Sequence, residues 1–210
     1  YKRTWGFCLS QKQLKSIKKK RYKVVIDSSF KDGVMDYGET LLKGKSKKEI
    51  LFSSYICHPS MVNNELSGPV ISAALIHYIN NLKNRKYSYR FVFVPETIGS
   101  IAYINKNLKK LKNDILAGFI INCAGDEKNY SFVHSPEKNT FADEIMKSSF
   151  IGLKTKTIYE FKDRSSDERQ YCSPGIELPV CSYSRSKAGS KTFPEYHSSL
   201  DNFSLVTKKV

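Results

Sequence analysis

The chain has 210 residues, 40% of them hydrophobic and 12% aromatic, which is enough to build a domain with a core and excludes a disordered chain. No run of about 18 apolar residues occurs, so we expect neither a membrane-spanning helix nor a membrane partner. The net charge of +15 arises from lysines spread over many short segments, with residues 18–21 (KKKR) as the only tight cluster. Because no aromatic residues are interleaved with that cluster, we expect no nucleic-acid partner.

The chain begins at Tyr1 without a methionine or the layout of a signal peptide, which predicts a piece of a longer protein. We expect residues 1–210 to form a single domain, and the oligomeric state is left open. Five cysteines without Cys-x-x-Cys spacing fit neither a disulfide framework nor a zinc finger. A reducing, cytoplasmic compartment is therefore the simplest expectation.

Apolar runs typical of strands alternate with helical patterns along the chain. Two runs flank an Asp-Gly pair and predict a hairpin of residues 22–29 and 35–42. Further strands are expected at 49–57, 89–96, 115–125 and 176–184, and helices at 66–82, 101–111 and 141–150. This rhythm predicts an α/β fold with a mixed, largely parallel sheet between layers of helices.

Polar residues follow three of these strands at the point where each strand ends. His58, Glu96 and the segment 122–126 all come directly after apolar runs. Because the carboxyl ends of parallel strands meet at one edge of a sheet, we expect these groups to lie close together. Each one alone has a plainer interpretation: His58 as a structural histidine and Glu96 as a carboxylate at a helix start.

Two later segments complete the pattern. Ser166-Asp167 precedes residues 175–179 (GIELP), although dense charge before an apolar run is typical of a solvated loop. His197 lies in a polar loop shortly before Asp201, which makes it a fair metal-ligand candidate that is weak by itself.

The order of these blocks resembles the zinc-dependent aminopeptidase superfamily, which includes glutaminyl cyclases. The matching blocks are His58, residues 64–68 (NELSG), residues 96–99 (ETIG), Ser166-Asp167 and residues 196–201 (YHSSLD). The chain is similar to a bacterial aminopeptidase-like domain family whose genes often accompany those of polysaccharide biosynthesis. The segments that carry this similarity are WGFC, CHPSM, PETIGS, SDERQYCSPG and YHSSLDN. The resemblance implies the phosphorylase/hydrolase-like α/β fold of zinc aminopeptidases.

The resemblance implies roles for several residues of this chain. His58 and His197 match zinc ligands, Glu96 matches the general base, and Tyr196 is a candidate oxyanion donor. One zinc ion is expected, held by the two histidines with help from an oxygen ligand of Asn64, Asp126 or Asp167.

The chain also departs from the superfamily pattern at four positions. Ser60 replaces an orienting aspartate, Asn64 the aspartate that bridges two metals, and Thr97 a ligand glutamate. Asn122 lies about where another ligand aspartate falls. Glu65 is an alternative to the lost bridging aspartate, but it comes one residue late when the motif is anchored on the Ser-Gly pair.

These residues lead to two hypotheses of different classes. The first is a metal-dependent aminopeptidase or amidohydrolase that cleaves a small peptide or aminoacyl amide with a metal-activated water. The alternative is a catalytically degenerate module on the same fold that binds an amino acid, a sugar or a partner protein. A third interpretation treats every histidine and glutamate as structural.

Overall fold

The computed structural model describes residues 5–6, 8–18, 21–189 and 192–207 and divides the chain into two compact units, Tyr1–Val34 and Met35–Val210. In the first unit, helix α1 (Gln11–Ser16) begins at a capping box in which Ser10 and Gln13 bond each other's backbone N–H groups. Every described residue of 5–34 is exposed. The hydrophobic core therefore lies in the second unit.

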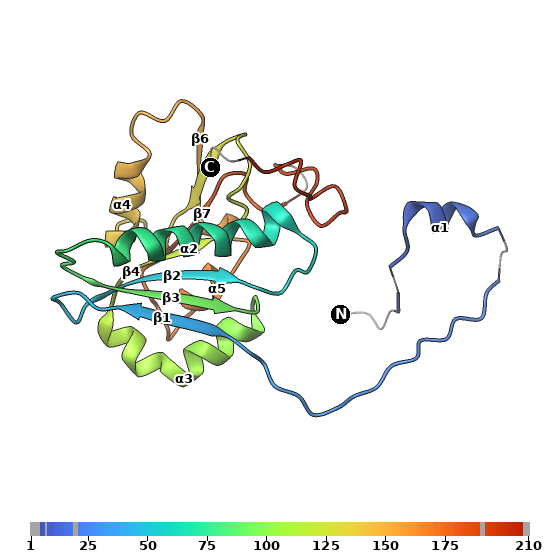
Figure 1. Cartoon of the computed structure of the whole chain (residues 1–210), viewed down its shortest axis with the longest axis horizontal. Helices are drawn as coiled ribbons and strands as arrows, with labels where there is room; N and C mark the ends of the chain where they lie inside the picture. Colours follow the sequence, from blue (N-terminus) through green and yellow to red (C-terminus); the bar gives the residue numbers. More distant parts are fainter. Residues whose placement is uncertain (1–4, 7, 19–20, 190–191, 208–210) are drawn as a thin grey trace. The chain divides into compact units, whose positions relative to one another are not determined.

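The second unit is built on a sheet of seven strands (Figure 1). In chain order its elements are β1 (Gly38–Leu42), β2 (Glu49–Tyr55), a π-turn (Val62–Leu66), α2 (Ser67–Asn80), β3 (Ser88–Val94), α3 (Ile98–Asp114), β4 (Ile115–Ile121), β5 (Tyr130–Val133), α4 (Phe141–Ser149), β6 (Lys156–Tyr159), a 3₁₀ turn (Phe161–Asp163), α5 (Glu168–Tyr171) and β7 (Val180–Ser184).

The sheet is mixed and largely parallel, with the order β1-β3-β2-β4-β7-β5-β6. The central strands β3, β2, β4 and β7 are parallel, and β5 and β6 are parallel to each other. Strand β1 joins β3 antiparallel at one edge, and β5 joins β7 antiparallel. This confirms the predicted α/β fold with a mixed, largely parallel sheet.

Helices cover both faces of the sheet (Figure 1). On one face, α3 and α5 pack Tyr103, Leu111 and Tyr171 against Leu51 and Ile120 of the sheet. On the other face, α4 packs against Phe119 and Phe132, and α2 lies over β2 and β4. Because helices cover both faces, β2 and β4 are buried along almost their whole length, as their continuous apolar runs predict.

The predicted hairpin of residues 22–29 and 35–42 is wrong. Residues 22–29 form no strand, and β1 pairs antiparallel with β3 instead, Thr40 opposite Phe91. A two-stranded hairpin has little stability of its own, so the second strand pairs with β3 at the edge of the large sheet. The Asp-Gly pair indicated a turn but not the pairing partner.

Among the described helices, none combines the length and the hydrophobicity that crossing a membrane requires.

Candidate functional site

The candidate site lies at the carboxyl edge of the central strands. His58 follows the end of β2 by three residues, Glu96 follows β3 by two, and Cys123 follows β4 by two. Because these strands are parallel neighbours, their ends meet at one edge, as the sequence predicts. The last described segment of the chain brings His197 to the same place.

Two imidazoles face each other there. The rings of His58 and His197 have centroids 5.3 Å apart, and the ring of Tyr196 stacks on that of His197 at 3.8 Å. Partial desolvation, and then the neighbouring His58, lower the pKa of His197, although the residue is exposed. A neutral imidazole keeps a lone pair for a metal ion, so this environment suits His197 as a ligand.

Glu96 lies beside this pair and is held by a neighbouring loop. Its Oε2 is 3.8 Å from Nε2 of His58, and its Oε1 accepts a hydrogen bond of 2.8 Å from Ser166 Oγ. The Glu96 backbone N–H donates to Cys57 Sγ at 3.1 Å. The carboxylate is thus fixed with one oxygen directed toward the histidines.

Asn64 is fully buried behind His58, in a neutral cluster. Its Nδ2 donates to the hydroxyl of Tyr55 at 3.2 Å, and its Oδ1 receives only a long contact of 4.0 Å from Cys123 Sγ. The ring of Tyr55 lies 5.0 Å from that of His58. Burial raises the pKa of Tyr55 and of Cys123 well above their usual values, so both stay protonated. Among the described residues, the amide oxygen of Asn64 thus receives no short hydrogen bond.

Asp167 supports the backbone beside Glu96. Its Oδ1 accepts hydrogen bonds from the Thr97 N–H at 2.8 Å and from Ser100 Oγ at 2.9 Å. Burial raises the pKa of Asp167 to about 7, an effect that the hydrogen bonds from Thr97 and Ser100 partly offset. Asp167 thus reaches the site through the turn that carries Glu96.

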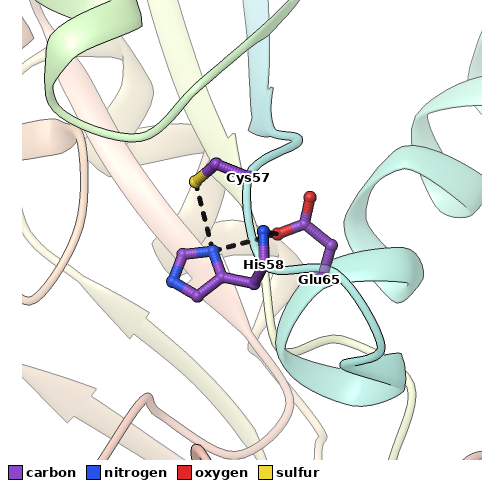
Figure 2. Close-up of side chains that lie close together, drawn as sticks. All are labelled: Cys57, His58 and Glu65. Carbon is purple, nitrogen blue, oxygen red and sulfur yellow. Dashed lines mark hydrogen bonds and ion pairs between the residues drawn. The ribbon is translucent and has the colours of Figure 1, made fainter. Parts of the chain in front are cut away.

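Glu65 has a clearer place in the structure than the sequence suggested. One of its oxygens, Oε2, accepts hydrogen bonds from the backbone N–H of His58 at 2.9 Å and from Nδ1 of its ring at 3.0 Å (Figure 2). Cys57 Sγ lies 3.2 Å from the same Nδ1. Burial raises the pKa of Glu65, whereas His58 opposes that rise. The one sequence signal for this contact is that Glu65 lies only seven residues after His58.

Asp201 joins the loop that carries His197 to the π-turn before α2. It is buried and accepts hydrogen bonds from three consecutive backbone N–H groups, those of Val62, Asn63 and Asn64, at 3.2, 2.7 and 2.9 Å. Its position four residues after His197 is the sequence signal for this contact.

Asp126, the other acidic candidate, has partners of its own. It accepts from Asn63 Nδ2 at 3.0 Å and from Ser186 Oγ at 2.8 Å. Asn122 is buried, and its Nδ2 has no hydrogen-bond partner within the described chain. Both residues lie near the edge, but neither offers a free carboxylate oxygen in the way a bridging aspartate would.

The two imidazoles have the spacing of ligands that share one metal ion. Two imidazoles that share a zinc ion hold their ring centroids about 5 Å apart, since each Zn–N bond is about 2.1 Å. The rings of His58 and His197 have that spacing, and Asn64 is the neighbouring oxygen-bearing side chain of the buried cluster beside His58. Neither Asn64 nor Thr97 offers a carboxylate to a metal ion.

A cavity of about 590 Å³ adjoins His58, a size typical of small-molecule sites. Its lining is mainly apolar, from Ile56, Met61, Val62, Leu66 and Phe203, with His58 and Glu65 among the polar groups.

The chain belongs to the DUF4910 family, described as a domain of unknown function, which matches residues 9–210. A protein of Clostridium acetobutylicum, provisionally named a polysaccharide biosynthesis protein with an aminopeptidase-like domain, is 41% identical over 209 residues, covering 99% of this chain and 47% of that protein. The chain therefore spans about half the length of this relative.

Solved structures show the same fold. A crystal structure provisionally named a peptidase of Clostridium acetobutylicum matches with a TM-score of 0.87 and 39% identity, over 100% of this chain and 49% of that one. A zinc aminopeptidase of Bacillus subtilis matches with 0.68 and 15%, over 81% and 45% of the two chains. A glutaminyl cyclase of Porphyromonas gingivalis matches with 0.63 and 13%, over 83% and 71%. The resemblance inferred from the motifs is confirmed, and the fold is that of the zinc aminopeptidases.

Proposed function

We propose that this domain is a zinc-dependent hydrolase that cleaves the amide bond of a small peptide or aminoacyl derivative. The observation that carries the proposal is the meeting of His58 and His197, 5.3 Å apart, with Glu96 Oε2 3.8 Å from His58 Nε2. The zinc aminopeptidase of Bacillus subtilis, which has the same fold, supports this proposal. His58, His197 and Asn64 are the proposed ligands of one ion.

The residues around the ion divide the work of hydrolysis. Zinc would polarise the substrate carbonyl and lower the pKa of the attacking water. Glu96, oriented by Ser166, accepts a proton from that water and passes it to the leaving amine. Tyr196 donates a hydrogen bond to the carbonyl oxygen as negative charge develops there, and burial, which raises its pKa to about 12, keeps its hydroxyl protonated. Asp167 is a support for Glu96 and Thr97 rather than a ligand.

The cavity beside His58, on the side of Glu65, is a candidate pocket for a substrate side chain. Its apolar lining suits a hydrophobic side chain, and its volume of about 590 Å³ suits a small molecule. Because a relative is named for polysaccharide biosynthesis, N-acylated amino sugars belong in the substrate screen beside aminoacyl amides.

Metal content tests the proposal. We expect about one zinc per chain in protein purified without chelators, and loss of that zinc in the His58→Ala/His197→Ala variant. The matched control is His77→Ala, because His77 is an exposed histidine of α2 outside the site. If the wild type contained no zinc even after incubation with the metal, the hydrolase proposal would be overturned. The hypothesis of a catalytically degenerate binding module would then be favoured.

Glu96→Gln separates the base from the ligands. We expect this variant to keep its zinc and to lose hydrolysis of aminoacyl amides by a factor of about 10² to 10⁴. Activity that survives the substitution would exclude Glu96 as the base.

A further inference from the structure

The imidazole of His58 is held on one edge by a single carboxylate oxygen. Glu65 Oε2 accepts both the backbone N–H of His58 at 2.9 Å and its ring Nδ1 at 3.0 Å (Figure 2). Side-chain exposure is only 20% for His58 and 13% for Glu65, so water competes little for these bonds. The contact therefore fixes the backbone and the ring together.

The position of Glu65 results from the irregular start of α2. Residues Val62–Leu66 form a π-turn, and Asp201 holds three successive N–H groups of it. A π-turn places more than the usual number of residues in one turn, which changes the direction of the side chains that follow. Glu65 consequently points back to His58 rather than out to solvent.

A carboxylate on Nδ1 determines what Nε2 can do. When Nδ1 donates its hydrogen, the neutral ring carries a lone pair on Nε2, the nitrogen that lies 3.8 Å from Glu96 Oε2. Metal-binding histidines are commonly oriented in this way by a carboxylate on the other nitrogen, which also makes the ligand more basic. Ser60, two residues after His58, has no carboxylate to offer for this purpose.

We infer that Glu65 is the positioning residue that orients His58 and fixes its Nδ1–H tautomer for metal binding through Nε2. This inference rests on the proposed function, because it concerns the same zinc site. It assigns Glu65 a role outside the ligand set and outside the proton transfers.

Cys57, His58 and Glu65 could instead bind a metal themselves, since one donor atom from each lies within 4.8 Å of the others. Two contacts argue against that arrangement. Glu65 Oε2 already accepts two hydrogen bonds from His58, and the ring Nδ1, which donates one of them, has no lone pair left for a metal ion. Glu65 therefore acts as a hydrogen-bonded support on the Nδ1 side of His58.

The test measures zinc affinity by competition with a chelator in Glu65→Gln and Glu65→Leu. Glu65→Gln keeps an acceptor without the charge, and we expect about 10-fold weaker binding; Glu65→Leu removes both, and we expect about 100-fold weaker binding. Glu144→Gln, at an exposed position of α4, is the control and should bind zinc as the wild type does. Wild-type affinity in Glu65→Leu would overturn the inference.

A second measurement does not depend on zinc. Nitrogen NMR of the His58 ring in the metal-free protein should show the hydrogen on Nδ1 in the wild type and its loss from Nδ1 in Glu65→Leu. If the wild type binds no zinc but shows this change, the proposed function fails and the tautomer assignment stands. An Nε2–H tautomer in the wild type would contradict the inference directly.

Cys57→Ser distinguishes the metal-binding alternative. We expect this variant to bind zinc normally, and the cobalt-substituted wild type to lack a thiolate charge-transfer band. Loss of zinc in Cys57→Ser together with such a band would make Cys57, His58 and Glu65 the metal site and overturn the inference.

Discussion

At the scale of single residues, the carboxyl edge of the sheet concentrates strained backbone. Four non-glycine residues there have positive φ: Ser60 at 70°, Thr97 at 64°, Cys123 at 44° and His197 at 55°. Each such residue costs about 1–3 kcal/mol, and such residues are common at functional sites. They follow or form the points at which the chain turns sharply to present His58, Glu96 and His197.

Thr97 shows the strain most clearly. With φ 64° and ψ −69° it is the centre of a γ-turn, closed by a hydrogen bond of 2.7 Å from the Ile98 N–H to the Glu96 carbonyl. This form of the γ-turn is rare and strained, especially for a β-branched residue. The turn directs Glu96 toward the histidines and the Thr97 N–H toward Asp167.

We expect Thr97→Gly to increase the free energy of unfolding by about 1 kcal/mol, because glycine adopts positive φ without steric cost. Unfolding in urea measures the change. Lys109→Gly in the middle of α3, where the backbone is regular, should instead lower the free energy of unfolding by about 1 kcal/mol. Equal losses in the two variants would show that Thr97 is not strained.

The sequence predicted part of this site. His58 and Glu96 could be placed because apolar strands precede them, and strand ends meet at one edge. The contact between Glu65 and His58 could not be predicted, because it depends on the π-turn, which changes side-chain directions in a way that the pattern of a regular helix does not show. The γ-turn at Thr97 was equally invisible, since a threonine ordinarily indicates extended chain or a helix cap.

At the scale of secondary-structure elements, the central strands and the edge strand β1 were predicted, whereas β5 and β6 were not. Strands β2, β3 and β4 have long apolar runs because both of their faces are buried. Strands β5 and β6 have only four residues each, too few to show a period, and they form because β7 and the sheet edge pair with them. Tertiary pairing also accounts for the failed hairpin.

Helix α4 depends on one buried carboxylate. Asp143 is fully buried, completes a capping box with Thr140, and accepts from Ser135 Oγ at 2.5 Å and from His134 Nδ1 at 2.7 Å. Burial alone would raise its pKa, but the hydrogen bonds from Ser135, Thr140, His134 and Cys181 outweigh it and hold the pKa well below the usual range. The charged form is thus the stabilising one.

We expect Asp143→Ala to lower the free energy of unfolding by about 3 kcal/mol at neutral pH, because it leaves several donors without an acceptor. Since the pKa is depressed in the folded state, this stability is present above the ordinary pKa of an aspartate and is lost as the pH falls toward the native value. Unfolding in urea at neutral and acidic pH should therefore show a smaller difference between wild type and variant in acid. A constant difference would contradict the charged hydrogen-bond network.

At the scale of the whole molecule, the site is assembled from parts of the chain that are far apart in sequence. His58 and Glu96 come from neighbouring strands, whereas His197 comes from a loop near the other end of the described chain. Asp201 connects these parts, since it lies four residues after His197 and binds the π-turn that carries Asn64 and Glu65. The two proposed histidine ligands are therefore linked through one buried carboxylate.

Asp201→Asn tests that link with little change in volume. Asp201 Oδ1 accepts from Val62 and Asn63, and Oδ2 accepts from Asn64, so an amide must turn one of its own donors toward a backbone N–H. We expect the free energy of unfolding to fall by about 2–3 kcal/mol. Hydrogen exchange should become faster at the amides of residues 62–64.

Zinc affinity should fall in the same variant, because both His197 and the π-turn that holds Glu65 lose their common support. Ser199→Ala, at an exposed position of the same loop, is the matched control and should change neither stability nor affinity. If Asp201→Asn were less stable but bound zinc as the wild type does, Asp201 would stabilise the fold without aligning the two histidines. If zinc affinity also fell in the folded variant, the segment that carries His197 and Asp201 would be shown to set the geometry of the metal site.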